Sequence, residues 1–411
     1  MRDGYAKILL VAAAALAVVV TTAMSAYAQD QEPVNGIRFG AFSIHPDLYT
    51  ALRYNDNVWF EPNNYRPANP RSIPQSIESD FVFNVTPSIN FNIDASTFHM
   101  SASYRFYNDT YLGFDDPNHQ HHLLDGSNHT VGGVIDYTAP FGLMIGGSDT
   151  FEKFEMYEQT GQFIDYVRGE QSHNDGRGWL GFKTGPYESI YFNAMYTNLI
   201  DKYEFFPGYN KTTQYLDGEF RLKFFPLTAF VMQGGYNFVT HETFHAADSR
   251  AWYADAGIQG AITSMFLLTL KGGYTQADFV TPPGYKTYLA TCELTFLFPG
   301  QAKLLLGYHH ILLPGVDTNY VETQQGVLDF SKTWFSKLST ELVVTYNYNN
   351  YSDPVPRLEN LILGTFDLTY RIVYWLYGGL GYELDYQILD RLGLKTTAVR
   401  NMPNIHLEAK F

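Results

Sequence analysis

Residues 81–93 read FVFNVTPSINFNI, and every second side chain of this stretch is apolar. From Asn84 onward the intervening positions are all Asn, Thr or Ser. Successive side chains of a β-strand point to opposite faces, so the pattern predicts a long strand with one apolar and one polar face. The same alternation recurs over residues 98–106, 266–275 and 380–387. The chain is therefore predicted to be all-β.

The length of these strands separates two kinds of β protein. Strands of soluble sandwiches are mostly ~5 to 6 residues long, whereas a tilted membrane-spanning strand needs ~9 to 11 residues. In lipid every backbone N–H and C=O needs a partner, and a sheet provides one for each only by closing on itself. We therefore predict a transmembrane up-and-down antiparallel β-barrel.

Short turns set the expected number of strands. They recur near residues 94–96, 139–140, 185–186, 225–226, 262–264, 299–300, 335–336 and 374–375. Longer polar segments lie between them, and we expect loops over Tyr111–Gly126, Met156–Asp175 and Leu389–Arg400. Short turns on one side and long loops on the other are typical of bacterial outer-membrane barrels. These turns separate nine strand pairs, which predicts about 18 strands, with 16 as the nearest alternative.

The N-terminal residues have the features of a signal peptide. Arg2 and Lys7 precede a short apolar run, and Ala26-Tyr27-Ala28 has the small-x-small pattern of a signal-peptidase site. We expect cleavage after Ala28, with an uncleaved anchor helix as the alternative. The predicted organisation is a signal peptide over residues 1–28, a periplasmic segment over 29–40 and a barrel over 41–411, located in the bacterial outer membrane.

The C-terminal strand carries an assembly signal. Asn404, His406, Glu408 and Lys410 alternate with Ile405, Leu407, Ala409 and Phe411. A terminal amphipathic strand that ends in Phe resembles the signal by which outer-membrane barrels are recognised for insertion. An ordinary edge strand that happens to end in Phe is the alternative. The expected partners are therefore the barrel-assembly machinery, outer-membrane lipid and lipopolysaccharide.

Aromatic residues flank the short turns, where amphipathic rings suit the headgroup level of a bilayer. This set is Tyr137, Phe141, Phe182, Tyr187, Phe224, Phe225, Phe298, Trp334, Phe335, Tyr374 and Trp375. General strand propensity for aromatic residues is the alternative for any single member. We predict that together they form an interfacial girdle.

Composition excludes several classes of protein. A single cysteine, Cys292, cannot build a disulfide scaffold or a thiolate metal site. With 27 Lys and Arg against 42 Asp and Glu, the net charge of −15 has the wrong sign for wrapping nucleic acid. We see no local basic stripe and expect no nucleic-acid partner.

Catalytic and metal-binding motifs are scarce. No nucleophile elbow, phosphate loop or zinc-protease helix is present. One cluster, His119, His121, His122 and His129 near Asp115, Asp116 and Asp125, could hold a divalent metal. A solvated polar loop is the favoured interpretation, because nothing in such a loop fixes ligand geometry. We therefore expect no catalytic residue, no metal and no cofactor.

The polar face of the strands gives the candidate functional residues. An 18-stranded barrel is wide enough to hold water, so charged side chains can line it and sort solutes. The candidates for the lumen are Arg105, Glu219, Arg221, Lys223, Lys271, Glu293, Glu341, Asp367, Arg371, Glu383, Asp385 and Glu408. Mutual ion pairing that only holds the wall together is the alternative for each. Acidic residues of the long loops further suggest an acidic outer mouth over a mixed inner end.

The N-terminal part of the barrel also resembles a known family. Pro46, the stretch Tyr54-Asn55-Asp56-Asn57-Val58, Ser79-Asp80, Pro87-Ser88-Ile89, Tyr104 and Tyr107 carry the resemblance, over roughly residues 42–137. This pattern is similar to the outer-membrane β-barrel porin family associated with exopolysaccharide-synthesis operons. The resemblance implies a barrel that accompanies polysaccharide secretion, together with a periplasmic polysaccharide-export protein and an inner-membrane polymerase system.

The sequence thus predicts a channel for a secreted carbohydrate polymer, with Tyr107, Tyr191 and Trp252 as inward rings that could stack on sugars. Two alternatives stay open. One is a general diffusion porin for small solutes, and a loop over Glu152–Gly178 folded into the lumen would constrict either channel. The other is an enzyme or adhesin that uses the barrel only as an anchor.

Overall fold

The structure is a computed structural model of the full chain. It describes residues 36–58, 78–114, 121–158, 167–184, 189–203, 210–243, 245, 248–280, 284–314, 320–352, 356–391 and 394–411. The predicted signal peptide and its cleavage site at Ala28 lie outside these residues.

Nearly all described residues belong to strands. The barrel strands are β2(Phe42–Asn55), β3(Asp80–Asp94), β4(Phe98–Tyr111), β5(Gly126–Thr138), β6(Leu143–Glu158), β7(Val167–Lys183), β8(Ile190–Tyr203), β9(Lys211–Phe225), β10(Thr228–His241), β11(Ser249–Thr263), β12(Phe266–Phe279), β13(Tyr285–Phe298), β14(Ala302–Pro314), β15(Tyr320–Trp334), β16(Leu338–Tyr351), β17(Arg357–Val373), β18(Leu376–Arg391) and β19(Leu394–Lys410). A short strand, β1(Ile37–Phe39), pairs with the start of β2, and one 3-10 turn, η1(His121–Leu124), precedes β5. Within the described part of the chain, no helix is long and apolar enough to cross a membrane.

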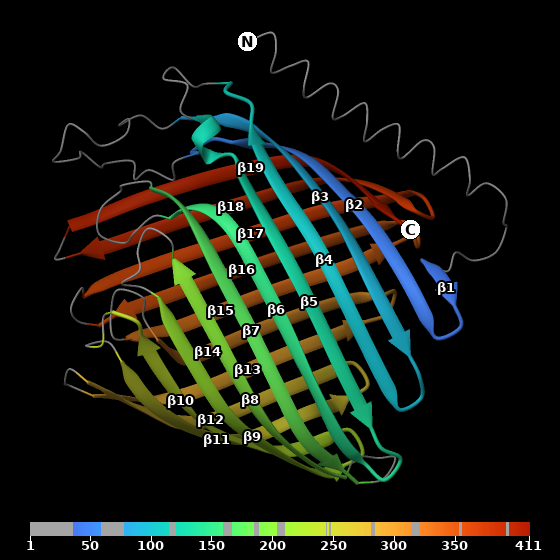
Figure 1. The fold of residues 1–411 in the computed structure, drawn as a ribbon, viewed down its shortest axis with the longest axis vertical. Helices are drawn as coiled ribbons and strands as arrows, with labels where there is room; N and C mark the ends of the chain where they lie inside the picture. Colours follow the sequence, from blue (N-terminus) through green and yellow to red (C-terminus); the bar gives the residue numbers. More distant parts are fainter. Residues whose placement is uncertain are drawn as a thin grey trace.

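Each barrel strand pairs antiparallel with its two neighbours in sequence, and the first closes on the last (Figure 1). The closing ladder joins Asp47–Arg53 of β2 to Asn404–Lys410 of β19. Strands β2 to β19 thus form a closed up-and-down barrel, and the predicted 18 strands are confirmed. β1 adds no strand to the closed wall, because it extends the edge of β2 at residues 42–44, beyond the end of β19.

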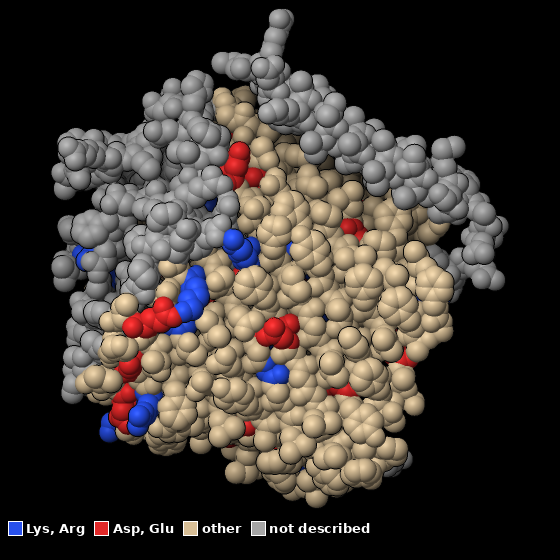
Figure 2. Space-filling model, viewed as in Figure 1, with Lys and Arg blue, Asp and Glu red and all other residues tan. Residues whose placement is uncertain are grey.

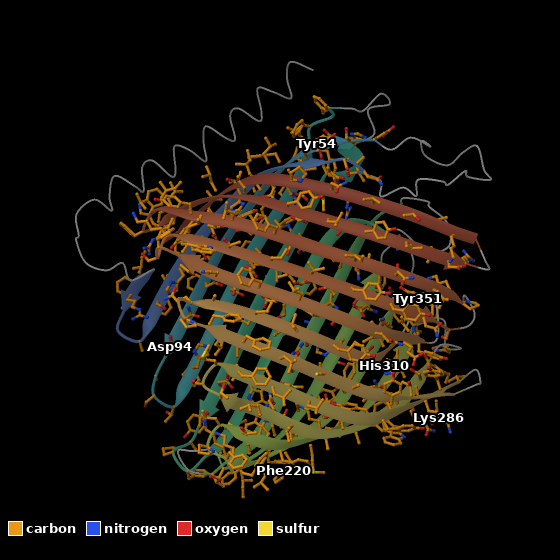
Figure 3. All side chains as sticks on the ribbon, turned by 180° about the vertical axis from the view of Figure 1, so that it is seen from behind. Tyr54, Asp94, Phe220, Lys286, His310 and Tyr351 are labelled. Carbon is orange, nitrogen blue, oxygen red and sulfur yellow. The ribbon has the colours of Figure 1, made fainter. Side chains whose placement is uncertain are left out.

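The two ends of the barrel differ as predicted. Seven of the predicted short turns connect successive strands at one end, which we call the short-turn end, and the opposite end is the loop end. The eighth, at residues 185–186, lies outside the described residues. Figure 3 shows Asp94 at the short-turn end, and Lys286, His310 and Tyr351 at the loop end.

Two of the three expected loops are wrong. Tyr111–Gly126 does connect β4 to β5, but most of Met156–Asp175 and Leu389–Arg400 is strand. Ladder pairs join β6 to β7 out to Glu158–Val167, and β18 to β19 out to Arg391–Leu394. The prediction of a loop over Glu152–Gly178 that folds into the lumen fails for the same reason, since residues 152–158 and 167–178 pair within the wall. These hairpins run beyond the membrane span, where polar side chains can face water on both sides.

Large apolar side chains cover the outside of the wall. Ile145 on β6, Leu180 on β7 and Ile405 on β19 are each more than half exposed. Figure 2 shows this outer surface with few charged side chains across its middle and more of them toward the loop end. Such an apolar outer band is the feature that places a barrel in a bilayer, and the protein is an outer-membrane-type β-barrel.

The expected aromatic girdle is largely present. Nine of its members are more than a third exposed beside the short turns: Tyr137, Phe141, Phe182, Phe224, Phe225, Phe298, Trp334, Phe335 and Tyr374. Tyr187 lies outside the described residues. Trp375 is the exception, because it is buried to 9% exposure and stacks on Phe411, with ring centroids 5.5 Å apart.

The contact between Trp375 and Phe411 explains how the chain end joins the wall. The Phe411 amide donates to the Pro46 carbonyl at 3.0 Å, so the terminal residue bridges β18 and β2 across the closing seam. We expect Phe411→Ala to lower the yield of folded barrel, because it removes the ring that fills this junction. The folded fraction, seen as the fast-migrating band of unheated protein in gel electrophoresis, measures this. Phe335→Ala, at an exposed turn, is the matched control, and an equal loss in both variants would contradict the prediction.

The seam is joined at the loop end by side chains. The Asp56 carboxylate accepts hydrogen bonds from the Asn401 backbone amide and side-chain amide, each at 2.6 Å. Asn57 donates to the Val399 carbonyl at 2.9 Å. The motif Tyr54–Val58 that carries the family resemblance therefore connects the first strand to the last above the point where their ladder ends.

A buried polar cluster lies next to the seam. Asp80 is fully buried and accepts hydrogen bonds from the amides of Phe81, Gly113 and Phe114 at 2.7–2.8 Å. The His121 ring lies between two carboxylates, with Nδ1 3.0 Å from Asp80 and Nε2 2.9 Å from Glu78. This cluster fixes η1 and the end of β4 against the start of β3.

Candidate functional site in the barrel lumen

The twelve predicted lumen residues all lie on one side of the wall. In every case the neighbours along the strand are outward apolar or small residues, such as Leu222 beside Arg221 and Lys223, Leu270 beside Lys271, and Leu407 beside Glu408. The register of the ladders carries this inward face continuously from strand to strand. The structure therefore places all twelve on the inward face, while their part in moving a solute stays a prediction.

One polar network crosses β9, β10 and β12. Glu219 accepts a hydrogen bond from the Gln233 amide at 2.5 Å, and the Gln233 carbonyl oxygen accepts one from Lys271 at 2.6 Å. Arg221 pairs with Glu219, and its guanidinium carbon lies 4.9 Å from the centroid of the Tyr191 ring. These contacts hold Arg221 and Lys271 against the wall, and the rest of each cationic group stays accessible to the lumen.

A second network lies on β2 and β4. Arg53 donates to the Tyr107 hydroxyl at 2.7 Å and pairs with Asp109, and Tyr107 in turn donates to Asp109 at 2.6 Å. Asn84 donates to the same carboxylate at 2.9 Å. Nearby on β18 and β19, Arg400 donates through Nε to Asp385 at 2.9 Å. Charges in this part of the lumen are thus largely compensated within the wall.

Charge is distributed unevenly around the barrel toward the short-turn end. Strands β7 and β9 place Lys183, Arg221 and Lys223 there, and we call these three residues the basic arc. Nine strands further round, β16, β17 and β18 place Glu341, Asp367 and Glu383 on the inward face, and we call these the acidic arc. Because β9 and β18 lie on opposite sides of an 18-stranded barrel, the two arcs face each other across the lumen. Arg371 on β17 and Glu219 on β9 each offset one charge of these arcs, and the charge that remains on the two sides produces a transverse field that acts on charged or dipolar solutes.

Tyrosine is the main aromatic residue of the inward face. Tyr107 and Tyr191 point inward as predicted, and Tyr253 and Tyr351, which the sequence did not single out, do so as well. Their hydroxyls are held by carboxylates, since Tyr253 donates to Asp217 at 2.9 Å and Tyr351 to Glu359 at 2.8 Å.

The prediction that Trp252 points inward is wrong. Its ring is 40% exposed on the outer surface and contacts the outward Tyr274 ring at 5.7 Å between centroids. Trp252 and Tyr253 are adjacent and point to opposite faces of the wall, and only the register of β11 decides which of the two is inward.

The histidine cluster does not form a metal site among the described residues, where no group of three or more potential ligands is placed to hold an ion. His121 is not a solvated loop residue, since it is fully buried between Glu78 and Asp80. His129 lies on β5 next to Tyr104 at 3.0 Å. Asp115, Asp116 and His119 lie outside the described residues.

A carboxylate on β6 faces the lipid side of the wall. Asp149 lies near the middle of the span on β6, is exposed, and accepts a hydrogen bond from Asn174 at 3.0 Å. Its ladder partners are Gly133 and Gly176, so no large side chain shields it.

We expect Asp149→Leu to stabilise the barrel in a bilayer by about 1–2 kcal/mol, because lipid-facing charges near the midplane are destabilising. Urea titration of the protein in liposomes measures the change. Asp136→Leu, an inward carboxylate that accepts from Trp179 at 3.0 Å, should be destabilising instead. A loss of stability for Asp149→Leu would show that this carboxylate is covered by something other than lipid.

Comparisons with known proteins identify no family for this chain. No family model and no curated protein matches the chain. Among solved structures, the chain is similar to a mutant ferric enterobactin receptor from Pseudomonas aeruginosa, with 7% identity, a TM-score of 0.45 and coverage of 90% of this chain and 81% of the receptor. The FrpB iron transporter from Neisseria meningitidis is 8% identical, with a TM-score of 0.46 and coverage of 89% of this chain and 81% of the transporter. The alcaligin outer membrane receptor from Bordetella pertussis is 10% identical, with a TM-score of 0.40 and coverage of 89% of this chain and 76% of the receptor. Scores and identities this low carry no argument about activity.

Proposed function

We propose that this barrel is an outer-membrane channel that accompanies the export of a secreted polysaccharide. The observation that carries the proposal is the chemistry of the inward face, where tyrosine rings stand beside carboxylates and amides on β4, β11 and β16. Aromatic faces suit the apolar faces of sugar rings, and carboxylates and amides suit their hydroxyls. The family resemblance of residues 42–137 supports the same cargo.

The architecture fits a conduit. Barrels of 16 to 18 strands leave an aqueous channel, whereas barrels of about 8 strands are filled by side chains. The described residues form the wall, its turns, β1 and η1, and none of them builds a separate domain inside the lumen. A periplasmic polysaccharide-export protein at the short-turn end would complete the path.

A general diffusion porin for small solutes is the second candidate, and the facing basic and acidic arcs favour it, since such a field also sorts small ions. Two measurements distinguish the export channel, the diffusion porin and a barrel that only anchors an enzyme or adhesin. Purified protein in planar bilayers should conduct, because a barrel that serves only as an anchor would not. Deletion of the gene should remove surface carbohydrate if the cargo is a polymer, and should leave it unchanged if the barrel is a diffusion porin.

A further inference from the structure

The wall departs from a regular barrel between β13 and β14. Both strands continue to the loop end, yet their ladder stops at the pair Ala290–His310. Tyr285–Leu289 and Ile311–Pro314 are therefore not hydrogen-bonded to each other, although β13 still pairs with β12 and β14 still pairs with β15. The end of the β14–β15 hairpin has left the line of the wall.

Contacts show where this hairpin end goes. The Tyr320 ring of β15 stacks on inward Tyr285 of β13, with centroids 3.9 Å apart, and lies 5.7 Å from inward Phe279 of β12. Glu322 accepts from inward Thr287 at 2.9 Å and lies 3.0 Å from His310 Nε2. Residues 311–314 and 320–322 thus lie over the inner surface of β12 and β13, and we call them the lid.

A cavity of about 300 Å³ lies beneath the lid. Its wall side carries Tyr215, Asn237, Tyr253 and Asp255, and its lid side carries Ile311, Leu312 and Leu313 with Tyr320. This volume is at the lower end for small-molecule sites, and apolar surface with a few polar groups is the usual lining of such sites. Its lining residues belong to the loop-end halves of β9 to β15.

The lining selects the charge of the ligand. Asp255 contributes a carboxylate whose Oδ1 is buried without a hydrogen-bond partner. No Lys or Arg is among the described residues that line the cavity. A hydroxyl or ammonium group could donate to Asp255, whereas an anionic ring would face this carboxylate, with the nearby cation Lys271 outside the lining and hydrogen-bonded to Gln233.

We propose that this cavity is a subsite that holds a neutral or amino sugar, with the lid closing over the ring. The inference rests on the proposed function, because it identifies where and how the channel contacts a carbohydrate. The rings of Tyr215, Tyr253 and Tyr320 pack on the sugar, and Asp255 with Asn237 accepts from and donates to its hydroxyls. The subsite makes the loop end of the channel selective for uncharged or cationic sugar units.

Single-channel recording with two probes tests the proposal. Maltohexaose, a neutral oligomer, should interrupt the current from the loop side with longer residence than an oligogalacturonate of equal length. Asp255→Asn should shorten the maltohexaose residence roughly 10- to 100-fold, as expected for loss of a charge-assisted hydrogen bond. Ala251→Phe, which fills the cavity, should abolish the slow block. Isothermal titration in detergent gives the same comparison independently of conductance.

Matched controls come from the same wall. Ala254→Phe adds the same volume on the outward face of β11, and Asp329→Asn removes an inward carboxylate that pairs with Lys303 at 2.9 Å on another part of the wall. Both should leave the residence time unchanged. If Ala251→Phe and Asp255→Asn leave the residence times of both probes unchanged, the subsite is overturned and the proposed channel is not. Absence of any carbohydrate binding, together with unchanged surface carbohydrate after gene deletion, would instead overturn the proposed function.

Discussion

Replacing Asp80 with alanine is expected to cost the barrel about 3–5 kcal/mol of stability, the usual effect of removing one partner from a buried ionic cluster. Asp80 is fully buried and bonds three backbone amides as well as His121. Without it those amides lose their acceptor, and His121 loses the carboxylate that contacts its Nδ1. Because the cluster lies beside the closing seam, we expect the first strands to open before the rest of the wall.

The measurement is urea titration in lipid vesicles, with the heat-dependent mobility of the folded band as a second readout. Asp94→Ala is the matched control, because Asp94 is on the same strand, also contacts a histidine at 2.6 Å, and is 64% exposed. It should change stability by less than about 0.5 kcal/mol. Equal effects of the two substitutions would show that burial of the cluster contributes nothing.

Reversal of the basic arc is expected to have the largest effect on transport. In the double variant Arg221→Glu, Lys223→Glu, the arc changes from three positive charges to a net negative one. A unit charge within ~4 Å of an ion contributes about 1 kcal/mol even in water, so the ratio of cation to anion permeability should rise roughly five- to tenfold. The reversal potential of bilayers under a salt gradient measures this ratio.

The opposite arc supplies the reciprocal experiment. Replacing Glu341 and Glu383 of the acidic arc, together with the inward Glu293 of β13, by Gln should lower cation preference, since three inward negative charges are removed. Lys286→Glu, which alters an outward residue at the loop end, should leave the ratio unchanged. If neither arc affects the reversal potential, these residues do not face the conduction pathway.

The architecture could be predicted from sequence because its determinants are local. A period of two is visible within a single strand, and the turns recur beside prolines and glycines such as Pro140 and Gly300. The predicted loops over Met156–Asp175 and Leu389–Arg400 are wrong because polar residues there belong mostly to strands. Beyond the bilayer both faces of a strand can be polar, so polarity alone does not indicate a loop there.

The site was only partly predictable, because its remaining features depend on contacts between distant segments. Alternation placed the lumen charges on one face, but it could not show that Arg53 meets Asp109 or that Tyr253 meets Asp217. The burial of His121 depends on Glu78 and Asp80, which lie more than 40 residues away. The sequence does not show that the lid leaves the wall, because only the early end of the β13–β14 ladder distinguishes it.

The closing ladder of seven pairs has a mechanical consequence. The ladders between all the other neighbouring barrel strands contain nine or more residue pairs. At the loop end, Asp56 and Asn57 add only a few hydrogen bonds to the ladder between β2 and β19. A load that pulls neighbouring strands apart would therefore meet its least resistance between β2 and β19. Once that junction has torn, the protein would peel from the membrane hairpin by hairpin, so the force needed for the first rupture sets how firmly the whole wall is anchored.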